Sequence, residues 1–183
     1  RSSAASDVYK RQTEYEVKGI KEAKSGTTLA GKNVNSYLNR LRKLNFVNTK
    51  IDAVVIQLST NDARFGYEIG EMSQSFDLES FDTETTLGAI EYIIKYVHTK
   101  WHCPIIFYTC IRENDLTYKQ LVNHLYPLKT KWDIHIIDIF NNDEINKLAE
   151  SDKEMMADDS HPTKKGYRYL YTPILVKQLD EIL

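Results

Sequence analysis

The chain has 183 residues, of which 42% are hydrophobic and 27% charged, and this is the composition of an ordinary globular domain. Its 24 Lys and Arg residues nearly balance 26 Asp and Glu residues, and no basic stripe follows the sequence, so we expect no nucleic-acid partner. The longest apolar runs, such as 51–58, are far shorter than the ~20 residues of a membrane-spanning helix, so we expect no transmembrane segment.

The first twelve residues, RSSAASDVYKRQ, lack the pattern of native structure. They contain neither the apolar core of a signal peptide nor the period of a helix or strand. Residues 7–12 resemble the translation of a transposase-adapter end used in preparing DNA for sequencing. We therefore predict a non-native segment at residues 1–12 and a single domain at residues 13–183. A native polar tail is the alternative.

From Thr13 onward, short apolar runs alternate with longer amphipathic stretches, which predicts βαβ units around a parallel sheet. The predicted fold class is therefore α/β. The clearest strand is 51–58, IDAVVIQL, a β-branched run typical of an inner parallel strand covered on both faces. Before it we expect a strand within 15–23 and a helix over 34–44, where leucines recur at helical spacing.

The rest of the chain continues the same alternation. A polar connection at 63–85 is long enough to cover a site. The elements expected after it are a helix at 87–101, a strand at 104–109, a helix at 116–132, a strand at 134–140, a short helix at 143–150 and a closing helix at 163–183.

The most informative local pattern is ADDSHPT, in which Asp158 lies three residues before His161. On a loop, a carboxylate at this spacing can fold back onto Nδ1 of the imidazole and stabilise the imidazolium, which leaves Nε2 to take a proton from a nucleophile. Thr163 can then cap the final helix. Taken by itself, such a pattern is more often a turn with an exposed histidine.

Asn61 directly follows the strand at 51–58, and open α/β sheets bind ligands beyond the carboxyl ends of their strands. Its side-chain amide can donate to the oxyanion of an acyl transfer, where each donor is worth about 3 to 4 kcal/mol of barrier. Gly26, in KSGTT, can bring a bare backbone N–H close to a ligand. Each position also fits an ordinary turn, but their joint occurrence at element boundaries favours a site.

Together these blocks resemble the SGNH/GDSL family of serine hydrolases, whose motifs are a Ser near the N-terminus, then Gly, Asn and a C-terminal Asp-x-x-His. KSGTT is similar to the second block, QLSTND to the third and ADDSHPTKKGY to the fifth, with FDTETTLGAIEYIIKYV as a further shared stretch. In the third block, Ser59 stands where the family usually has Gly. The resemblance runs from about Tyr15 to the end.

The resemblance implies a flavodoxin-like, three-layer α/β/α fold with a mainly parallel sheet, and cleavage of carboxylic esters through an acyl-enzyme. It implies that Asp158 and His161 are catalytic, and that the N–H of Gly26 and the amide of Asn61 form the oxyanion hole. It implies no cofactor or metal. The expected partner is a small-molecule ester, such as an acylated sugar or lipid.

The family's first block, a strand that ends in Gly-x-Ser, is absent ahead of Gly26. No serine of the chain replaces it, because those in 1–12 lie in the segment predicted as non-native, Ser25 adjoins the oxyanion glycine and Ser59 belongs to the third block. We therefore expect the first strand and the nucleophilic serine to be missing from this chain.

Two other functions are compatible with the same residues. A metal-dependent hydrolase could use Asp62, Asp158, Asp159 and His161 as ligands, since carboxylates and imidazole suit Zn or Mn. A non-catalytic binding module could be built on the same scaffold, because a fold does not determine a function. Chelator-sensitive activity would favour the first of these, and lack of labelling by a fluorophosphonate would favour the second.

Overall fold

The computed structural model describes residues 18–31, 33–44 and 49–183, which form two compact units. The sheet unit consists of Lys24–Thr109 and Asn114–Ile136, and the C-terminal unit consists of residues 18–23, Cys110–Glu113 and Ile137–Leu183. The non-native segment predicted at 1–12 lies outside the described residues. The single domain predicted at 13–183 stays a prediction.

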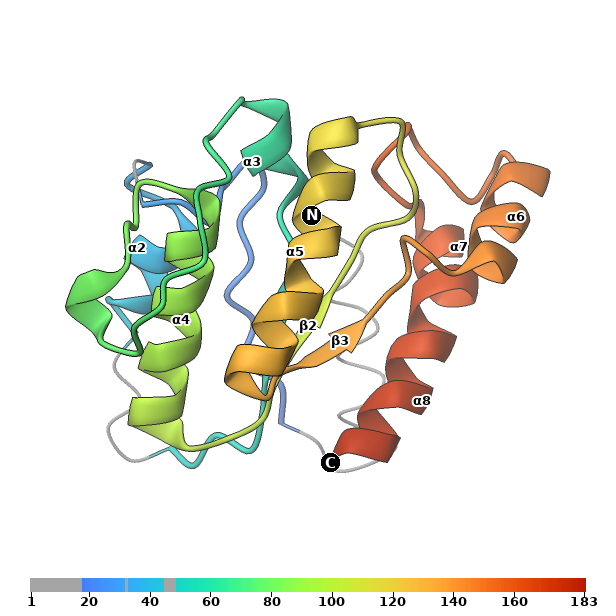
Figure 1. Ribbon diagram of the computed structural model, residues 1–183. Helices are drawn as coiled ribbons and strands as arrows, with labels where there is room; N and C mark the ends of the chain where they lie inside the picture. The colour runs from blue at the N-terminus through green and yellow to red at the C-terminus, as the bar shows by residue number, and fades with distance from the viewer. Residues whose placement is uncertain (1–17, 32, 45–48) are drawn as a thin grey trace. The chain divides into compact units, whose positions relative to one another are not determined.

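Among the described residues, three strands form one sheet in the order β1-β2-β3. Figure 1 labels β2 and β3. β1 (Val54–Gln57) and β2 (Ile105–Tyr108) run parallel, with Val54 opposite Ile105. The first three side chains of β2 are fully buried, as expected for a parallel strand covered on both faces. β3 (His135–Ile137) completes the sheet. The three strands predicted between residues 51 and 140 are confirmed, and each is shorter than its prediction.

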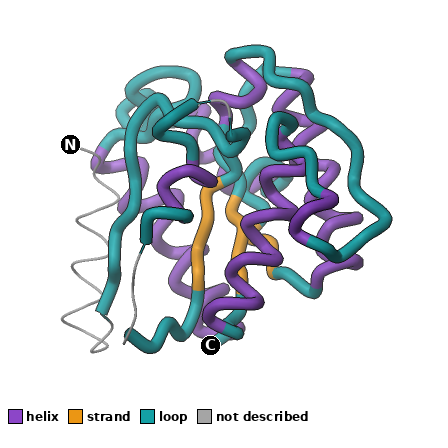
Figure 2. The backbone as a smooth tube through the Cα atoms, turned by 90° about the vertical axis from the view of Figure 1, so that its left-hand side faces the viewer, coloured by secondary structure: helices purple, strands orange, loops and turns teal. Residues whose placement is uncertain are grey.

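Helices flank these strands, which Figure 2 draws in orange. α4 (Thr86–Trp101) connects β1 to β2 along the chain, and α5 (Leu116–Trp132) connects β2 to β3. Both match their predicted ranges because both have clear end signals. Thr85 caps α4, Asp115 caps α5, and each helix is followed by a residue in the left-handed conformation. The predicted α/β class with a parallel sheet is confirmed.

The strand predicted within 15–23 is wrong where the structure describes it, because residues 18–23 form neither helix nor strand. Most of these residues are exposed, and the charged side chains of Lys18, Lys21 and Glu22 leave the segment without an apolar face to bury. Residues 15–17 lie outside the described residues.

Two other elements differ from prediction for reasons of capping. α2 (Tyr37–Leu41) is shorter than the helix predicted at 34–44, because Ser36 caps its start: the Oγ of Ser36 accepts from the N–H of Asn39 at 3.2 Å. α3 (Thr60–Arg64) lies where a turn was expected. Ser59 caps it by accepting from the N–H of Asn61 at 3.1 Å, so a helix starts directly after β1.

The described part of the C-terminal unit contains three α-helices and one π-helical turn: α6 (Asp143–Ser151), α7 (Lys164–Gly166), η2 (Tyr167–Tyr171) and α8 (Thr172–Ile182). The closing helix predicted at 163–183 is therefore interrupted. Pro173, in the first turn of α8, has no N–H to donate, and the Oγ1 of Thr172 donates to the carbonyl of Tyr167 at 2.9 Å. These two features accompany the change from the i→i+4 hydrogen bonds of an α-helix to the i→i+5 bonds of the π-helical turn.

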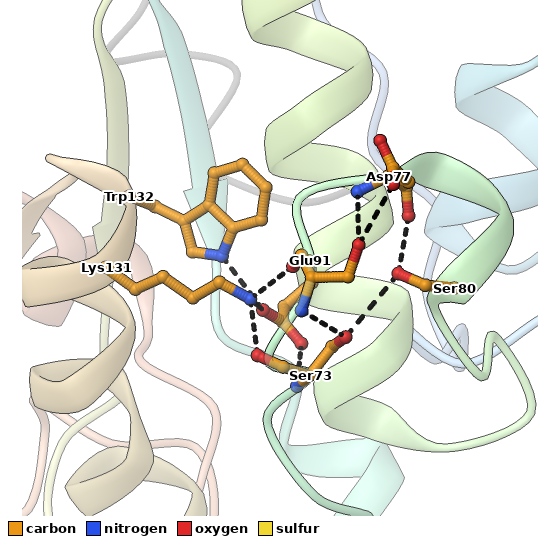
Figure 3. A network of polar contacts seen from close by, with 7 residues as sticks. Ser73, Asp77, Ser80, Glu91, Lys131 and Trp132 are labelled. Carbon is orange, nitrogen blue, oxygen red and sulfur yellow. Dashed lines mark hydrogen bonds and ion pairs between the residues drawn. The ribbon is translucent and has the colours of Figure 1, made fainter.

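The long connection predicted at 63–85 contains one 3-10 turn, η1 (Leu78–Ser80), and is anchored by Glu91 of α4 (Figure 3). The side chain of Glu91 is fully buried. Its carboxylate accepts from the N–H of Ser73 at 2.7 Å, from Nζ of Lys131 at 2.6 Å and from Nε1 of Trp132 at 3.0 Å. Both oxygens of this buried carboxylate are therefore hydrogen-bonded.

Nζ of Lys131 also donates to the carbonyl oxygens of Ser73 at 2.6 Å and Ser75 at 2.7 Å. Three aromatic rings lie around the same ammonium, within cation–π range. Their centroids lie 4.9 Å from Nζ for Phe76, 5.7 Å for Phe81 and 5.0 Å for Trp132. We call this group the lysine cage: Ser73, Ser75, Phe76, Phe81, Glu91, Lys131 and Trp132. It ties the connection to α4 and α5.

Candidate functional site

The Asp-x-x-His motif lies in a short antiparallel loop of the C-terminal unit, which we call the histidine hairpin (residues 155–163). Met156 and Pro162 form an antiparallel bridge. The N–H of Ala157 donates to the carbonyl of His161 at 2.8 Å, and the N–H of Thr163 donates to that of Met155 at 2.9 Å. The motif therefore lies at the tip of a hydrogen-bonded loop.

Asp158 and His161 are in contact at this tip. Nδ1 of His161 lies 2.8 Å from Oδ1 and 2.9 Å from Oδ2 of Asp158. Since a carboxylate can only accept, this contact places the proton on Nδ1 and leaves Nε2 as the basic nitrogen. The side chain of His161 is 63% exposed and that of Asp158 is 60% exposed. Their spacing predicts this contact, and their catalytic role stays a prediction.

The carboxyl of Asp158 is strongly stabilised in its ionised form. The N–H of Ser160 donates to Oδ1 at 2.9 Å, and the N–H of His161 donates to it at 2.8 Å. The Ser160 N–H and then the imidazole of His161 lower the pKa of Asp158 from 3.8 to about 2. At neutral pH this group is therefore a carboxylate that can stabilise an imidazolium.

The low pKa predicts a pH effect. Because the folded-state pKa of Asp158 lies below its ordinary value, its contribution to stability is present above pH 3.8 and is lost as the pH falls toward about 2. A titration of the carboxyl carbons by NMR checks the value. In a His161→Gln variant we expect the pKa of Asp158 to rise yet stay below 3.8, because the Ser160 N–H remains. A pKa at or above 3.8 in the unaltered chain would contradict the geometry.

Gly166 lets the hairpin approach the helix that follows it. Thr163 caps α7 by accepting from the N–H of Gly166 at 3.1 Å. A Cβ at position 166 would overlap the carbonyl oxygen of Met155 and press on Pro162. The close approach of these two backbones therefore requires glycine.

We expect Gly166→Ala to destabilise the protein. Alanine normally favours a helix by about 1 kcal/mol over glycine, but here the overlap is with backbone atoms and outweighs that gain, for a net loss of about 1–3 kcal/mol. Chemical denaturation measures the loss. Lys164→Ala, an exposed change in the same short helix, is the control and should stay within about 0.5 kcal/mol of the unaltered chain. Equal stability of the two variants would refute the close approach.

The oxyanion candidates lie in the sheet unit, where the structure brings their segments together. Nδ2 of Asn61, in the first turn of α3, donates to the carbonyl of Thr27 at 3.0 Å, and Oγ of Ser59 donates to the same carbonyl at 3.2 Å. Gly26 directly precedes Thr27, is exposed and has φ +71°, a conformation that glycine adopts without strain. Asn61 is thus fixed to the residue that follows Gly26.

Asp62, named above as a possible metal ligand, connects backbone segments in the structure. It is fully buried. Its carboxylate accepts from the N–H groups of Leu29 at 2.8 Å and Ala30 at 3.1 Å, and from Oγ1 of Thr86 at 3.2 Å. Burial raises the pKa of Asp62, and these hydrogen bonds oppose the rise. Both oxygens are therefore used in joining the 29–30 segment to α3 and α4.

The candidate residues thus form two pairs, one in each unit. Asp158 and His161 belong to the C-terminal unit, and Gly26 and Asn61 belong to the sheet unit. Over the described ranges, no group of three or more His, Cys, Asp or Glu side chains is arranged to hold a metal ion. Within those same ranges, no helix is long and apolar enough to cross a membrane.

Several solved structures share this fold. A protein described as a GDSL-like lipase from Bacteroides ovatus is 16% identical, with a TM-score of 0.67 over 98% of this chain and 78% of that one. A second such protein, from Bacteroides uniformis, is 14% identical, with a TM-score of 0.69 over 99% and 76%. A member of the lipolytic G-D-S-L family from Veillonella parvula is 17% identical, with a TM-score of 0.56 over 80% and 74%.

These likenesses establish that the chain has the α/β fold of the GDSL-like lipases, and the fold that the sequence motifs imply is confirmed. No protein-family model matches the sequence, and no curated protein matches it either.

Proposed function

We propose that this protein is a serine-type hydrolase of the SGNH kind that cleaves carboxylic esters. The observation that carries the proposal is the 2.8 Å contact between Nδ1 of His161 and the carboxylate of Asp158 on an exposed hairpin. An Asp–His pair with this geometry needs only a hydroxyl at Nε2 to act as a general-base system. The likeness in fold to GDSL-like lipases supports the same activity.

In the proposed reaction, a serine hydroxyl attacks the ester carbonyl while its proton passes to Nε2 of His161. Asp158 stabilises the imidazolium. The tetrahedral intermediate then breaks its bond to the alcohol, which takes the proton from Nε2 and leaves an acyl-enzyme. Water attacks the acyl-enzyme with the same proton transfers and releases the acid. The proposed nucleophile is a serine in a Gly-x-Ser segment encoded upstream of Thr13.

Gly26 and Asn61 are the proposed oxyanion donors. Nδ2 of Asn61 carries two hydrogens, and its bond to the Thr27 carbonyl uses one of them. The other is the proposed donor to the oxyanion, together with the N–H of Gly26, an exposed residue. The proposed substrate is a small-molecule ester, such as an acylated sugar or a lipid.

The test begins with sequencing of the source DNA across the codons before Thr13, by a method that uses no transposase adapter. The complete reading frame is then expressed and treated with a fluorophosphonate probe. We expect covalent labelling of one serine, mapped by mass spectrometry, and hydrolysis of p-nitrophenyl acetate. His161→Ala should abolish both, and a chelator should change neither.

Other results would favour other functions. A complete frame with no label on any serine would contradict the proposal and favour a binding module on the same fold. Esterase activity that a chelator abolishes, in a protein that the fluorophosphonate does not label, would favour metal-dependent hydrolysis.

A further inference from the structure

The tip of the histidine hairpin has one side chain that points inward. Asp158 and His161 are 60% and 63% exposed, whereas Ser160, between them in sequence, is only 7% exposed. The hydrogen bonds from the N–H groups of Ser160 and His161 to Asp158 are local, so they shape the tip but do not fix it to the rest of the unit.

Ser160 makes that longer-range connection. Its Oγ donates to Oε2 of Glu113 at 2.6 Å, across 47 residues of sequence. A hydrogen bond to a carboxylate is roughly twice as strong as one between neutral groups. The backbone N–H of the same serine donates to Asp158, so Ser160 links the two carboxylates.

Glu113 itself follows a well-anchored segment. The N–H of Arg112 donates to Oδ1 of Asn146 at 2.7 Å, and the N–H of Ile111 donates to the hydroxyl of Tyr171 at 2.8 Å. Asn146 is buried, and its Nδ2 donates to the carbonyls of Ile139 and Phe140 at 2.9 and 3.1 Å. The backbone that carries Glu113 is therefore joined to the core of the C-terminal unit.

We propose that Glu113 is a positioning residue for the imidazole of His161 and acts through Ser160. The carboxylate holds the Ser160 hydroxyl, and the Ser160 N–H in turn holds the Asp158 carboxylate that pairs with Nδ1 of His161. This inference rests on the proposed function for its kinetic consequence, but its structural consequence is measurable without any reaction.

The first test is NMR of the 183-residue chain with 15N-labelled histidine. The His161 signals are identified with His161→Gln. In the unaltered chain we expect the tautomer protonated at Nδ1. In Glu113→Ala and Ser160→Ala we expect a shift toward a mixture of tautomers, and Glu113→Gln, whose amide oxygen can still accept, should restore most of the Nδ1 tautomer. Glu150→Gln, an exposed change on α6, is the charge control.

The second test is a double-mutant cycle on the complete enzyme. We expect Glu113→Ala and Ser160→Ala each to lower kcat by about 10- to 100-fold with little change in KM, because a displaced base loses alignment without losing substrate contacts. The double variant should be no slower than the worse single variant. Equal tautomer populations in all variants, or additive effects on kcat, would overturn the proposal.

The two experiments separate two kinds of failure. If the complete frame shows no esterase activity, the proposed function fails, and the NMR experiment still decides whether Glu113 positions His161. If activity is present and the tautomer does not respond to Glu113→Ala or Ser160→Ala, only the positioning role fails.

Discussion

Lys131→Ala should lower the free energy of unfolding by about 3–5 kcal/mol, the usual result of removing one partner from a buried ion pair. The Lys131 side chain is 10% exposed and Glu91 is fully buried, so the variant leaves a carboxylate in the interior without its charge partner. The carbonyls of Ser73 and Ser75 lose a donor at the same time. Urea denaturation measures the change.

Chemical rescue distinguishes the lysine cage from general loss of packing. n-Propylammonium resembles the missing end of the side chain and should raise the Tm of Lys131→Ala without raising that of the unaltered chain. Lys129→Ala, an exposed change on the same helix, is the control and should be close to the unaltered chain with or without the amine. A Tm for Lys131→Ala within a degree of the control would show that the cage is not a source of stability.

His161→Ala should lower kcat/KM of the complete enzyme by a factor of about 10^4 or more, because removing the base from a nucleophile–base pair disables the pair as a unit. The side chain is 63% exposed and its only described partner is Asp158, so we expect the Tm to change little. Initial rates on p-nitrophenyl acetate, compared with the Tm of each variant, separate chemistry from folding. Unchanged turnover would remove His161 from the site.

Asn61→Ala tests the proposed oxyanion donor in the sheet unit. Loss of one oxyanion donor is expected to lower kcat by about 10^2- to 10^3-fold and to raise KM less. Its bond to the Thr27 carbonyl also disappears. Ser59→Ala removes the other donor to that carbonyl and the cap of α3, so it measures the structural part of the loss. If Ser59→Ala lowers kcat as much as Asn61→Ala, the structure around Thr27 and α3 accounts for the loss, and donation by Asn61 to the oxyanion does not.

Sequence patterns predict the elements of this chain best where local signals agree. α5 matches its predicted range because Asp115 caps it, apolar residues recur at helical spacing and a residue in the left-handed conformation, Asp133, follows it. α3 could not be predicted in the same way. Its five residues are too few for a periodic pattern. In the sequence, Ser59 is as compatible with a turn as with a helix cap, and only its contact with the N–H of Asn61 identifies it as a cap.

The candidate site shows the same division between local and long-range contacts. The contact between Asp158 and His161 spans three residues, so spacing predicts it. The bonds from Ser160 to Glu113 and from Lys131 to Glu91 span 47 and 40 residues, and neither has a periodic or motif signal. Asp62 likewise accepts from the N–H groups of Leu29 and Ala30, which lie 33 and 32 residues away, so no local pattern predicts that it connects these segments.

The lysine cage also gives this protein an internal reporter. An amine-reactive reagent must reach Nζ, and that of Lys131 is enclosed by three rings and three oxygen acceptors. In the native protein Lys131 should therefore acylate slowly while Lys129, exposed on the same helix, acylates quickly. The ratio of the two modified peptides in a mass spectrum measures how often the 73–81 segment lifts away from α4 and α5, with no change to the sequence.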